Sequence, residues 1–214
     1  FLRVSSLAGV TGATSGTGLS TVDKQKTKGV SALEALDAVG DAELSPAFIS
    51  AAGVPTLVSR DSRYNAAIAL SVTAKDVAPG VSFVLNDQNL VNDVKGTRVG
   101  GAEVRQVNAA SVAYYGSRTE TMSLIVDSDV QMAAVVQWNA PVRAEPAPRT
   151  DSLRIDGWAK QATVDLDDLL ALDVGSRVNV TGLPSTAPAA TLDLFTEGIA
   201  DTFSTDGWQR TLNT

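Results

Sequence analysis

Residues 67–74 read Ala-Ile-Ala-Leu-Ser-Val-Thr-Ala and carry an apolar side chain at every second position: Ile68, Leu70, Val72 and Ala74. A period of two is typical of a strand with one buried face, because successive side chains point to opposite faces. More strand-like runs follow at 81–85, 90–99 and 102–107. The last two are joined by Gly100-Gly101, which favours a tight hairpin turn. The middle of the chain is therefore predicted to be β-rich.

The last third of the chain also consists of short strand-like segments. Breaks with Pro or Gly, at 145–148 and 182–184, separate the apolar runs 142–144, 153–155, 177–181, 191–203 and 208–212. Many short strands with turn signals between them are typical of a sandwich or a barrel. We therefore expect a β-rich α+β fold with a barrel or sandwich of short antiparallel strands.

A small α+β unit, a helix plus a hairpin, is predicted ahead of these strands. Ser31 and Glu34 have the Ser-x-x-Glu spacing of a capping box, which satisfies two amides at a helix start. An apolar face at helical spacing follows, which consists of Leu33, Leu36 and Val39. Gly40 or the acidic step after it is expected to end the helix. Two apolar runs, 47–50 and 56–60, flank a turn with Gly and Pro and favour a hairpin.

A second helix is predicted within the β-rich part. Ser128 and Gln131 have the spacing of another capping box, and Pro141 is expected to stop the helix. The predicted apolar face consists of Val130, Ala133, Ala134 and Trp138.

The predicted domain organisation follows the order of the chain. Residues 1–29 begin with an apolar stretch, 1–10, and continue as a segment rich in Gly, Ser and Thr with Lys24, Lys26 and Lys28, which is typical of a linker. Residues 30–88 are expected to form the small α+β domain. Residues 89–214 are expected to form a barrel-type domain with one or two helices.

The composition excludes several classes of chemistry. The 214 residues contain no cysteine and no histidine, which removes disulfides, thiolate ligands and histidine-based catalysis. The net charge is −7 and the 17 basic residues are scattered, which argues against a nucleic-acid-binding protein. The longest uncharged run of mainly apolar residues, 44–59, is too short for a membrane span and contains Pro46 and Pro55. Because the sequence starts with Phe1 rather than Met, we expect it to be part of a longer or processed product.

The densest carboxylate group is a candidate calcium site. It comprises Asp165, Asp167 and Asp168, with Asp173 nearby. Carboxylates suit hard cations, but the stretch lacks the glycine and the final glutamate of an EF-hand loop. We interpret it as a helix start capped by Asp165 or Asp167. The leucines expected to face inward are Leu166, Leu169, Leu170 and Leu172.

Three further patterns could indicate enzyme chemistry. The glycine-rich stretch 12–18 resembles a phosphate loop but is followed by Leu19-Ser20 instead of Lys and Ser or Thr, so we interpret it as a flexible loop. Thr21 with Lys24 has the wrong nucleophile for a Ser–Lys dyad, and Ser71 with Lys75 has the wrong spacing. A carboxylate pair could hydrolyse glycosides, but nothing marks one. No catalytic, cofactor-binding or metal-binding residue is predicted, and the protein is predicted not to be an enzyme.

The aromatic residues could form a platform for sugars. Only 5% of the residues are aromatic, and large rings are needed to fill a core or an interface. We therefore predict packing roles for Tyr114, Tyr115, Trp138, Trp158 and Trp208.

Several longer phrases of the sequence resemble the minor tail proteins of actinobacterial bacteriophages. The resemblance covers roughly residues 30 to 214, where the order of the phrases is more specific than any single one. The phrases are Ser31-Ala-Leu-Glu-Ala-Leu-Asp-Ala-Val, Arg63-Tyr-Asn, Leu90-Val-Asn-Asp-Val-Lys-Gly-Thr-Arg-Val-Gly-Gly, Ser111-Val-Ala-Tyr-Tyr-Gly-Ser-Arg, 172–184 and 198–214. The family also has a preceding N-terminal half, which these residues do not include.

The resemblance implies a structural subunit of the tail tip or baseplate hub, with β-barrels joined to small α+β insertions and no catalytic residue to transfer. It implies a virion protein that is assembled in the bacterial cytoplasm and caps the tail tube. The implied partners are further copies of itself, a trimer rather than a hexamer, and other tail-tip and tail-tube proteins. DNA would only pass through the channel, and no membrane is implied. The alternative is a β-sandwich module that binds carbohydrate or a receptor.

Overall fold

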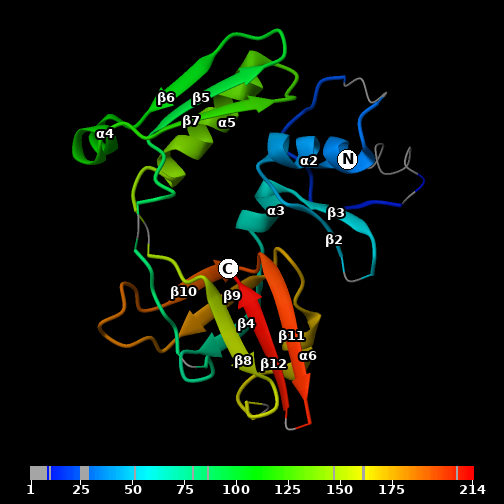
Figure 1. The fold of residues 1–214 in the computed structure, drawn as a ribbon, viewed down its shortest axis with the longest axis vertical. Coiled ribbons are helices and arrows are strands. Elements are labelled where there is room, and N and C mark those ends of the chain that lie inside the picture. Colours follow the sequence, from blue (N-terminus) through cyan, green and yellow to red (C-terminus); the bar gives the residue numbers. More distant parts are fainter. Residues whose placement is uncertain are drawn as a thin grey trace. The chain divides into compact units, whose positions relative to one another are not determined.

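The computed structural model describes residues 9, 11–24, 29–50, 52–78, 80–85, 87–146, 148–160, 162–205 and 207–214 (Figure 1). Most of the apolar start, as well as Lys26 and Lys28, lies outside the described residues. The chain forms two units: unit 1 comprises 1–62 and 86–147, and unit 2 comprises 63–85 and 148–214. This grouping differs from the expected division at 29/30 and 88/89, because the strand at 68–73 pairs with a strand near residue 180.

The first sheet of unit 1 contains the predicted hairpin. β2 (Ala47–Ile49) and β3 (Pro55–Val58) pair antiparallel, and β1 (Ala13–Ser15), from the expected linker, pairs parallel with β3. α2 (Ala32–Glu43) begins as predicted, because the Ser31 hydroxyl accepts a hydrogen bond from the Glu34 N–H at 3.1 Å.

Of the two predicted ends of α2, Gly40 is wrong, and the helix ends in the acidic step that follows it. The helix continues to Glu43 and ends at Leu44, whose φ of 51° lies in the left-handed region. A Cβ at Gly40 would lie 3.0 Å from the Ser45 carbonyl oxygen. Glycine at this position therefore allows close approach of the following chain and does not end the helix.

The second sheet of unit 1 has the order β6-β5-β7. β5 (Asp93–Arg98) and β6 (Val104–Val107) form the hairpin predicted around Gly100-Gly101. β7 (Thr119–Leu124) pairs parallel with β5 and was not predicted, because Thr-Glu-Thr-Met-Ser-Leu has few apolar residues. α4 (Ala109–Tyr115) was also missed; it precedes β7.

α5 (Asp129–Val142) covers one face of this sheet, and its N-cap is the predicted Ser128. The predicted apolar face is wrong: Val130 is 80% exposed. The buried residues are Met132, Val135, Val136, Asn139 and Ala140. The helix has a single charged residue, Asp129, so apolar periodicity could not distinguish its two sides. Pro141 lies in its last turn, and the predicted strand at 142–144 is not formed.

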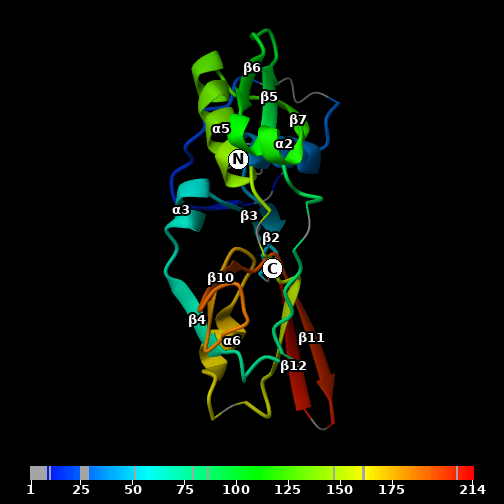
Figure 2. The ribbon, with the colours of Figure 1, turned by 90° about the vertical axis from the view of Figure 1, so that its left-hand side faces the viewer.

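Unit 2 consists of two three-stranded sheets with the orders β10-β9-β4 and β11-β12-β8. Their strands are β4 (Ile68–Thr73), β8 (Ser152–Asp156), β9 (Arg177–Thr181), β10 (Leu192–Phe195), β11 (Gly198–Ser204) and β12 (Gly207–Asn213). Figure 2 shows β4 and β10 in one layer and β11 and β12 in the other. The predicted run 191–203 is divided into two strands that belong to different sheets.

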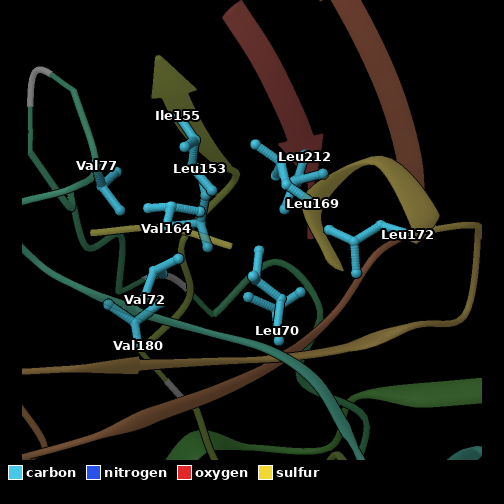
Figure 3. Packing of buried hydrophobic residues seen from close by; sticks show 11 residues of the cluster. Leu70, Val72, Val77, Leu153, Ile155, Val164, Leu169, Leu172, Val180 and Leu212 are labelled. Carbon is cyan, nitrogen blue, oxygen red and sulfur yellow. The ribbon is translucent and has the colours of Figure 1, made fainter. Parts of the chain in front are cut away.

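The core of unit 2 lies between its two sheets, where alternate strand residues meet (Figure 3). β4 supplies Leu70 and Val72, as the period of two predicted. Partners from other elements include Leu153, Ile155, Leu169, Val178, Val180 and Leu212. Burying alternate residues of both sheets in this way is typical of sandwich packing.

The β-rich α+β class is confirmed, with sandwich-like sheets, but within the described residues no sheet closes into a barrel. Three strand pairs, β1–β3, β4–β9 and β5–β7, are parallel, which the antiparallel expectation did not include. The predicted strand at 81–85 is reduced to a single bridge between Val84 and Arg149. α3 (Arg60–Tyr64) was not predicted. Among the described residues, no helix has the length and apolar character needed to cross a membrane.

Candidate functional site

The acidic stretch in unit 2 caps a helix. Asp165 accepts hydrogen bonds from the N–H groups of Asp167 and Asp168 at 3.0 and 3.2 Å, at the start of α6 (Leu166–Ala171). Leu169 is fully buried, but Leu170 is 56% exposed, so the inward orientation expected for all four leucines is wrong. A helix of six residues can turn only one narrow face to the core. Within the described part of the chain, no three potential metal ligands come together.

The glycine-rich stretch 12–18 is bound to the rest of unit 1. A Cβ at Gly16 would overlap the Ser62 side chain, and its φ of 77° also favours glycine. The N–H groups of Leu19 and Ser20 donate to the Glu43 carboxylate at 2.9 and 2.8 Å. These amides follow the stretch directly, so an anionic side chain of the protein already occupies them. The arrangement differs from a flexible loop and from a phosphate-binding loop.

Glu43 is a structural residue that the sequence analysis missed. Its side chain is buried, with 3% of the residue exposed, and it also accepts a hydrogen bond from the Arg60 N–H at 3.3 Å. One carboxylate thereby connects the segment at 19–20, the end of α2 and the start of α3. The bonded residues lie 17 to 24 positions away, so no local pattern could indicate them.

Neither candidate Ser–Lys pattern forms a dyad. The Thr21 N–H donates to the Gln131 side chain at 2.7 Å, which attaches this segment to α5. Ser71 lies within β4 opposite Asn179 of β9. The carbonyl of Lys75 accepts a hydrogen bond from the Lys160 ammonium at 2.8 Å. The contacts at these positions are structural.

The buried carboxylate of the second sheet in unit 1 is paired with an arginine. Asp93 accepts two hydrogen bonds from Arg105, at 2.7 and 2.8 Å, and one from the Thr119 hydroxyl at 2.9 Å. The hydrogen bonds from Arg105 lower the pKa of Asp93 to about 2. The carboxylate is therefore held in its charged form.

Unit 2 contains a similar pair. Arg210 donates to both oxygens of Asp201, at 2.8 and 2.7 Å, and the Trp208 ring N–H donates to the same carboxylate at 2.8 Å. Hydrogen bonding from Arg210 lowers the pKa of Asp201. A general acid for glycoside hydrolysis needs a raised pKa, so neither carboxyl has the property that this chemistry requires.

The aromatic residues divide into packed and exposed groups. Tyr115, Trp138 and Trp208 are half-buried, in agreement with the predicted packing, and Arg60 lies over the Trp138 ring at 5.1 Å. Tyr114 and Trp158 are 81% and 65% exposed, so they do not fill the core of the chain, and packing at a subunit interface stays a prediction for them. Tyr114 still contacts the Tyr115 ring edge-to-face, with the ring centres 4.6 Å apart.

An aromatic cluster lies at the hairpin of β11 and β12; we define it as Trp158, Phe203 and Trp208. Phe203 and Trp208 stack with centres 6.1 Å apart and planes 7° apart. Gly157 lies against the Trp208 ring, where a Cβ would overlap it. Phe203 is 73% exposed, and the sequence analysis did not single it out. Exposed aromatic side chains of this kind are common in contact surfaces.

These observations define a protein of packed sheets with ion-paired carboxylates and an exposed aromatic cluster. No known protein family matches the sequence. No curated protein matches it either. The fold is similar to that of the 43 kDa tail protein of prophage MuSo2 from Shewanella oneidensis, with a TM-score of 0.61 and 11% identity over 99% of this chain and 61% of that chain.

A second solved structure, the tail protein from Neisseria meningitidis MC58, gives a TM-score of 0.65 and 13% identity over 98% of this chain and 64% of that chain. The chain thus has the fold found in phage tail proteins, and it spans less than two thirds of the length of either one.

Proposed function

We propose that the protein is a structural subunit of a bacteriophage tail tip or baseplate hub, which caps the tail tube and organises neighbouring tail proteins. The observation that carries the proposal is the fold similarity to two tail proteins over 98–99% of this chain. The sequence phrases quoted above independently resemble minor tail proteins. The proposed location is the virion, after assembly in the bacterial cytoplasm.

The proposed partners are other copies of the chain, as a trimer, and the adjoining tail-tip and tail-tube proteins. A stable contact in such an assembly buries more than about 1,000 Å². The test is to raise an antibody against the protein and to label purified phage particles for electron microscopy. Label at the end of the tail opposite the head is expected. Label at the head or along the tube, or its absence from particles, would contradict the proposal.

The protein is proposed to be non-catalytic. Without histidine and cysteine, hydrolysis would have to depend on carboxylates or a lysine. The ion pairs Asp93–Arg105 and Asp201–Arg210 stabilise charged carboxylates instead. We expect no release of sugars or peptides from bacterial cell walls. Turnover that disappears when one Asp or Glu is changed to its amide would overturn this expectation.

The acidic excess of the chain suits a channel for DNA. A basic lumen would hold DNA through counterion release, whereas an acidic one would let it slide. A net charge of −7 also keeps the protein soluble, and solubility alone is sufficient to explain the acidic excess. If Asp165, Asp167 and Asp168 line the channel, changing them to Lys should slow genome ejection and leave tail assembly intact. Unchanged ejection kinetics would contradict a role in the channel.

A second candidate function is a module that binds carbohydrate or a receptor. The observation in its favour is the aromatic cluster, in which Trp158 and Phe203 are mostly exposed. Sugars stack on exposed aromatic faces, so a glycan array is the direct test. Binding that is lost in Trp158→Ala would favour this function over the hub.

A further inference from the structure

β11 is a free edge of its sheet. In the order β11-β12-β8 it pairs with β12 and, among the described residues, with no other strand. All seven residues of β11 pair with β12 in continuous register. Residues 200–204 are exposed. In Figure 2, β11 lies at the outside of unit 2.

The pairing on the other side of β12 shows which backbone groups of β11 point outward. The Gly157 N–H donates to the Trp208 carbonyl at 2.9 Å, so Trp208 directs its backbone groups toward β8. Residues of an antiparallel ladder alternate in direction, so Phe203, opposite Trp208, directs its own groups away from β12. The same alternation applies to Ile199 and Asp201. These three residues present N–H and C=O groups along the open edge.

This edge lacks the features that usually prevent strand addition. Natural edge strands carry lysines, prolines or bulges, or are very short. Residues 198–204 read Gly-Ile-Ala-Asp-Thr-Phe-Ser, and their register with β12 is unbroken. The single charge, Asp201, is neutralised by Arg210 and hydrogen bonded to Trp208. An exposed edge of this length is a template for another strand.

β11 is complementary to a second β11. When two copies are placed antiparallel about Asp201, all seven residues overlap and the outward groups of one strand face those of the other. Ile199 then lies opposite Phe203, and apolar cross-strand pairs of this kind stabilise sheets. Ala200 lies opposite Thr202 on the other face. The two Asp201 carboxylates meet at the centre, each neutralised by its own Arg210.

We infer that two copies of this chain pair through β11 about a two-fold axis and form a continuous six-stranded sheet from two three-stranded ones. The occupant of the edge is a second copy because β11 itself has the length, backbone direction and apolar pattern that the edge requires. The inference rests on the edge strand and is independent of the proposed tail role. A two-fold pair is a different assembly from the trimer proposed above, and sedimentation velocity distinguishes the two.

Engineered cysteines test the register, since the protein has no cysteine of its own. Ala200 and Thr202 would face each other as a non-hydrogen-bonded pair, with Cα atoms about 4.5 Å apart, which suits a disulfide. An equal mixture of Ala200→Cys and Thr202→Cys is expected to give a disulfide-linked dimer under mild oxidation, at least fivefold more than either variant alone. Ser185→Cys, in an exposed loop of unit 2, is the control for random collision.

A proline tests the backbone contact itself. Phe203→Pro removes an outward N–H and leaves the hydrogen bonds to β12, whereas Phe203→Ala keeps that N–H and removes only the ring. We expect the wild-type dimer in sedimentation velocity, a monomer for Phe203→Pro, and a retained but weaker dimer for Phe203→Ala. Circular dichroism verifies that each variant is folded. If Phe203→Pro does not fold, the cysteine mixture still tests whether two copies pair through β11.

A wild-type monomer at about 100 μM, or a mixture yield no higher than that of the single variants, would overturn the inference. A dimer that persists in folded Phe203→Pro would also overturn it. A crosslink in particles between position 203 and another tail protein would overturn it too, because a different partner would then occupy the edge. Labelling of the tail tip tests the proposed function separately. A monomeric protein can still be located at the tail tip, and a dimeric protein can be absent from it.

Discussion

The sheet β6-β5-β7 in unit 1 and the two sheets of unit 2 bury their apolar faces in different ways. In unit 1, α5 covers one face, and Gly96 of β5 lies against Met132 and Val136 of the helix. In unit 2, one sheet covers the other, and Leu70 and Val72 meet side chains from the opposite layer. α5 approaches β5 closely where the strand has no side chain, at Gly96, whereas the two sheets of unit 2 pack through alternate residues of both layers. This difference determines which substitutions each unit tolerates.

The largest expected effect comes from truncating the helix contact of unit 1. Met132 is fully buried, so Met132→Ala should lower the free energy of unfolding by about 2–5 kcal/mol. Val130→Ala on the exposed side of α5 should change it by less than about 0.5 kcal/mol. Urea unfolding followed by tryptophan fluorescence measures both. Equal losses for the two variants would contradict the observed orientation of α5.

Substitutions at two glycines compare how tightly side chains are packed within each unit. Gly96→Ala should cost about 1–3 kcal/mol, because the new Cβ overlaps two buried side chains and the helix must shift. Gly157→Ala in unit 2 should cost less, because Trp208 is only half-buried and can move away. Thermal unfolding ranks the two variants. A greater loss for Gly157→Ala would show that the aromatic cluster is the more rigid contact.

Helix caps should give smaller effects in both units. Ser128→Ala removes the hydroxyl that accepts from the Gln131 N–H at 3.3 Å, and a loss of about 1 kcal/mol is expected. Asp165→Ala should cost a similar amount, since it removes two accepted hydrogen bonds at the start of α6. Asp165→Asn is the matched control, because the amide oxygen can still cap the helix. A full loss in that control would indicate that charge, not capping, matters there.

The last comparison concerns the ion pairs, whose contribution changes in acid. The folded pKa of Asp93 is about 2, below its usual value of 3.8, so the group stabilises the fold above pH 4. That contribution is lost as the pH falls from about 4 to 2. In Asp93→Asn, this part of the pH dependence of the unfolding midpoint should disappear. Asp193→Asn is the comparison in unit 2, where hydrogen bonds from Asn179 and Arg177 lower the pKa of Asp193. An unchanged acid profile in Asp93→Asn would contradict the role of Arg105.

The strands of unit 2 were more predictable than those of unit 1. β4 alternates between buried and exposed residues, so a period of two revealed it, whereas β9 and β12 were indicated as apolar runs between breaks with Pro or Gly. β7 was missed because it lies at a sheet edge and its sequence is mostly polar. The face of α5 was assigned wrongly because both sides of the helix are apolar. For the candidate sites, the cap at Asp165 was predictable from local spacing, whereas the contacts of Glu43 join distant segments.

Local chemistry in the sequence determined the helix starts at Ser31 and Ser128, a third start at Asp165 or Asp167, the hairpins and the β-rich class, because caps, turns and alternation depend on neighbours a few residues apart. It also determined the absence of cysteine and histidine chemistry. Only the tertiary structure decided that β4 joins β9 rather than its neighbours in the chain, which side of α5 is buried, and that no described strand covers the outer edge of β11. These features depend on which surfaces meet across long separations, and the free energy of burial that selects them is a property of the whole fold.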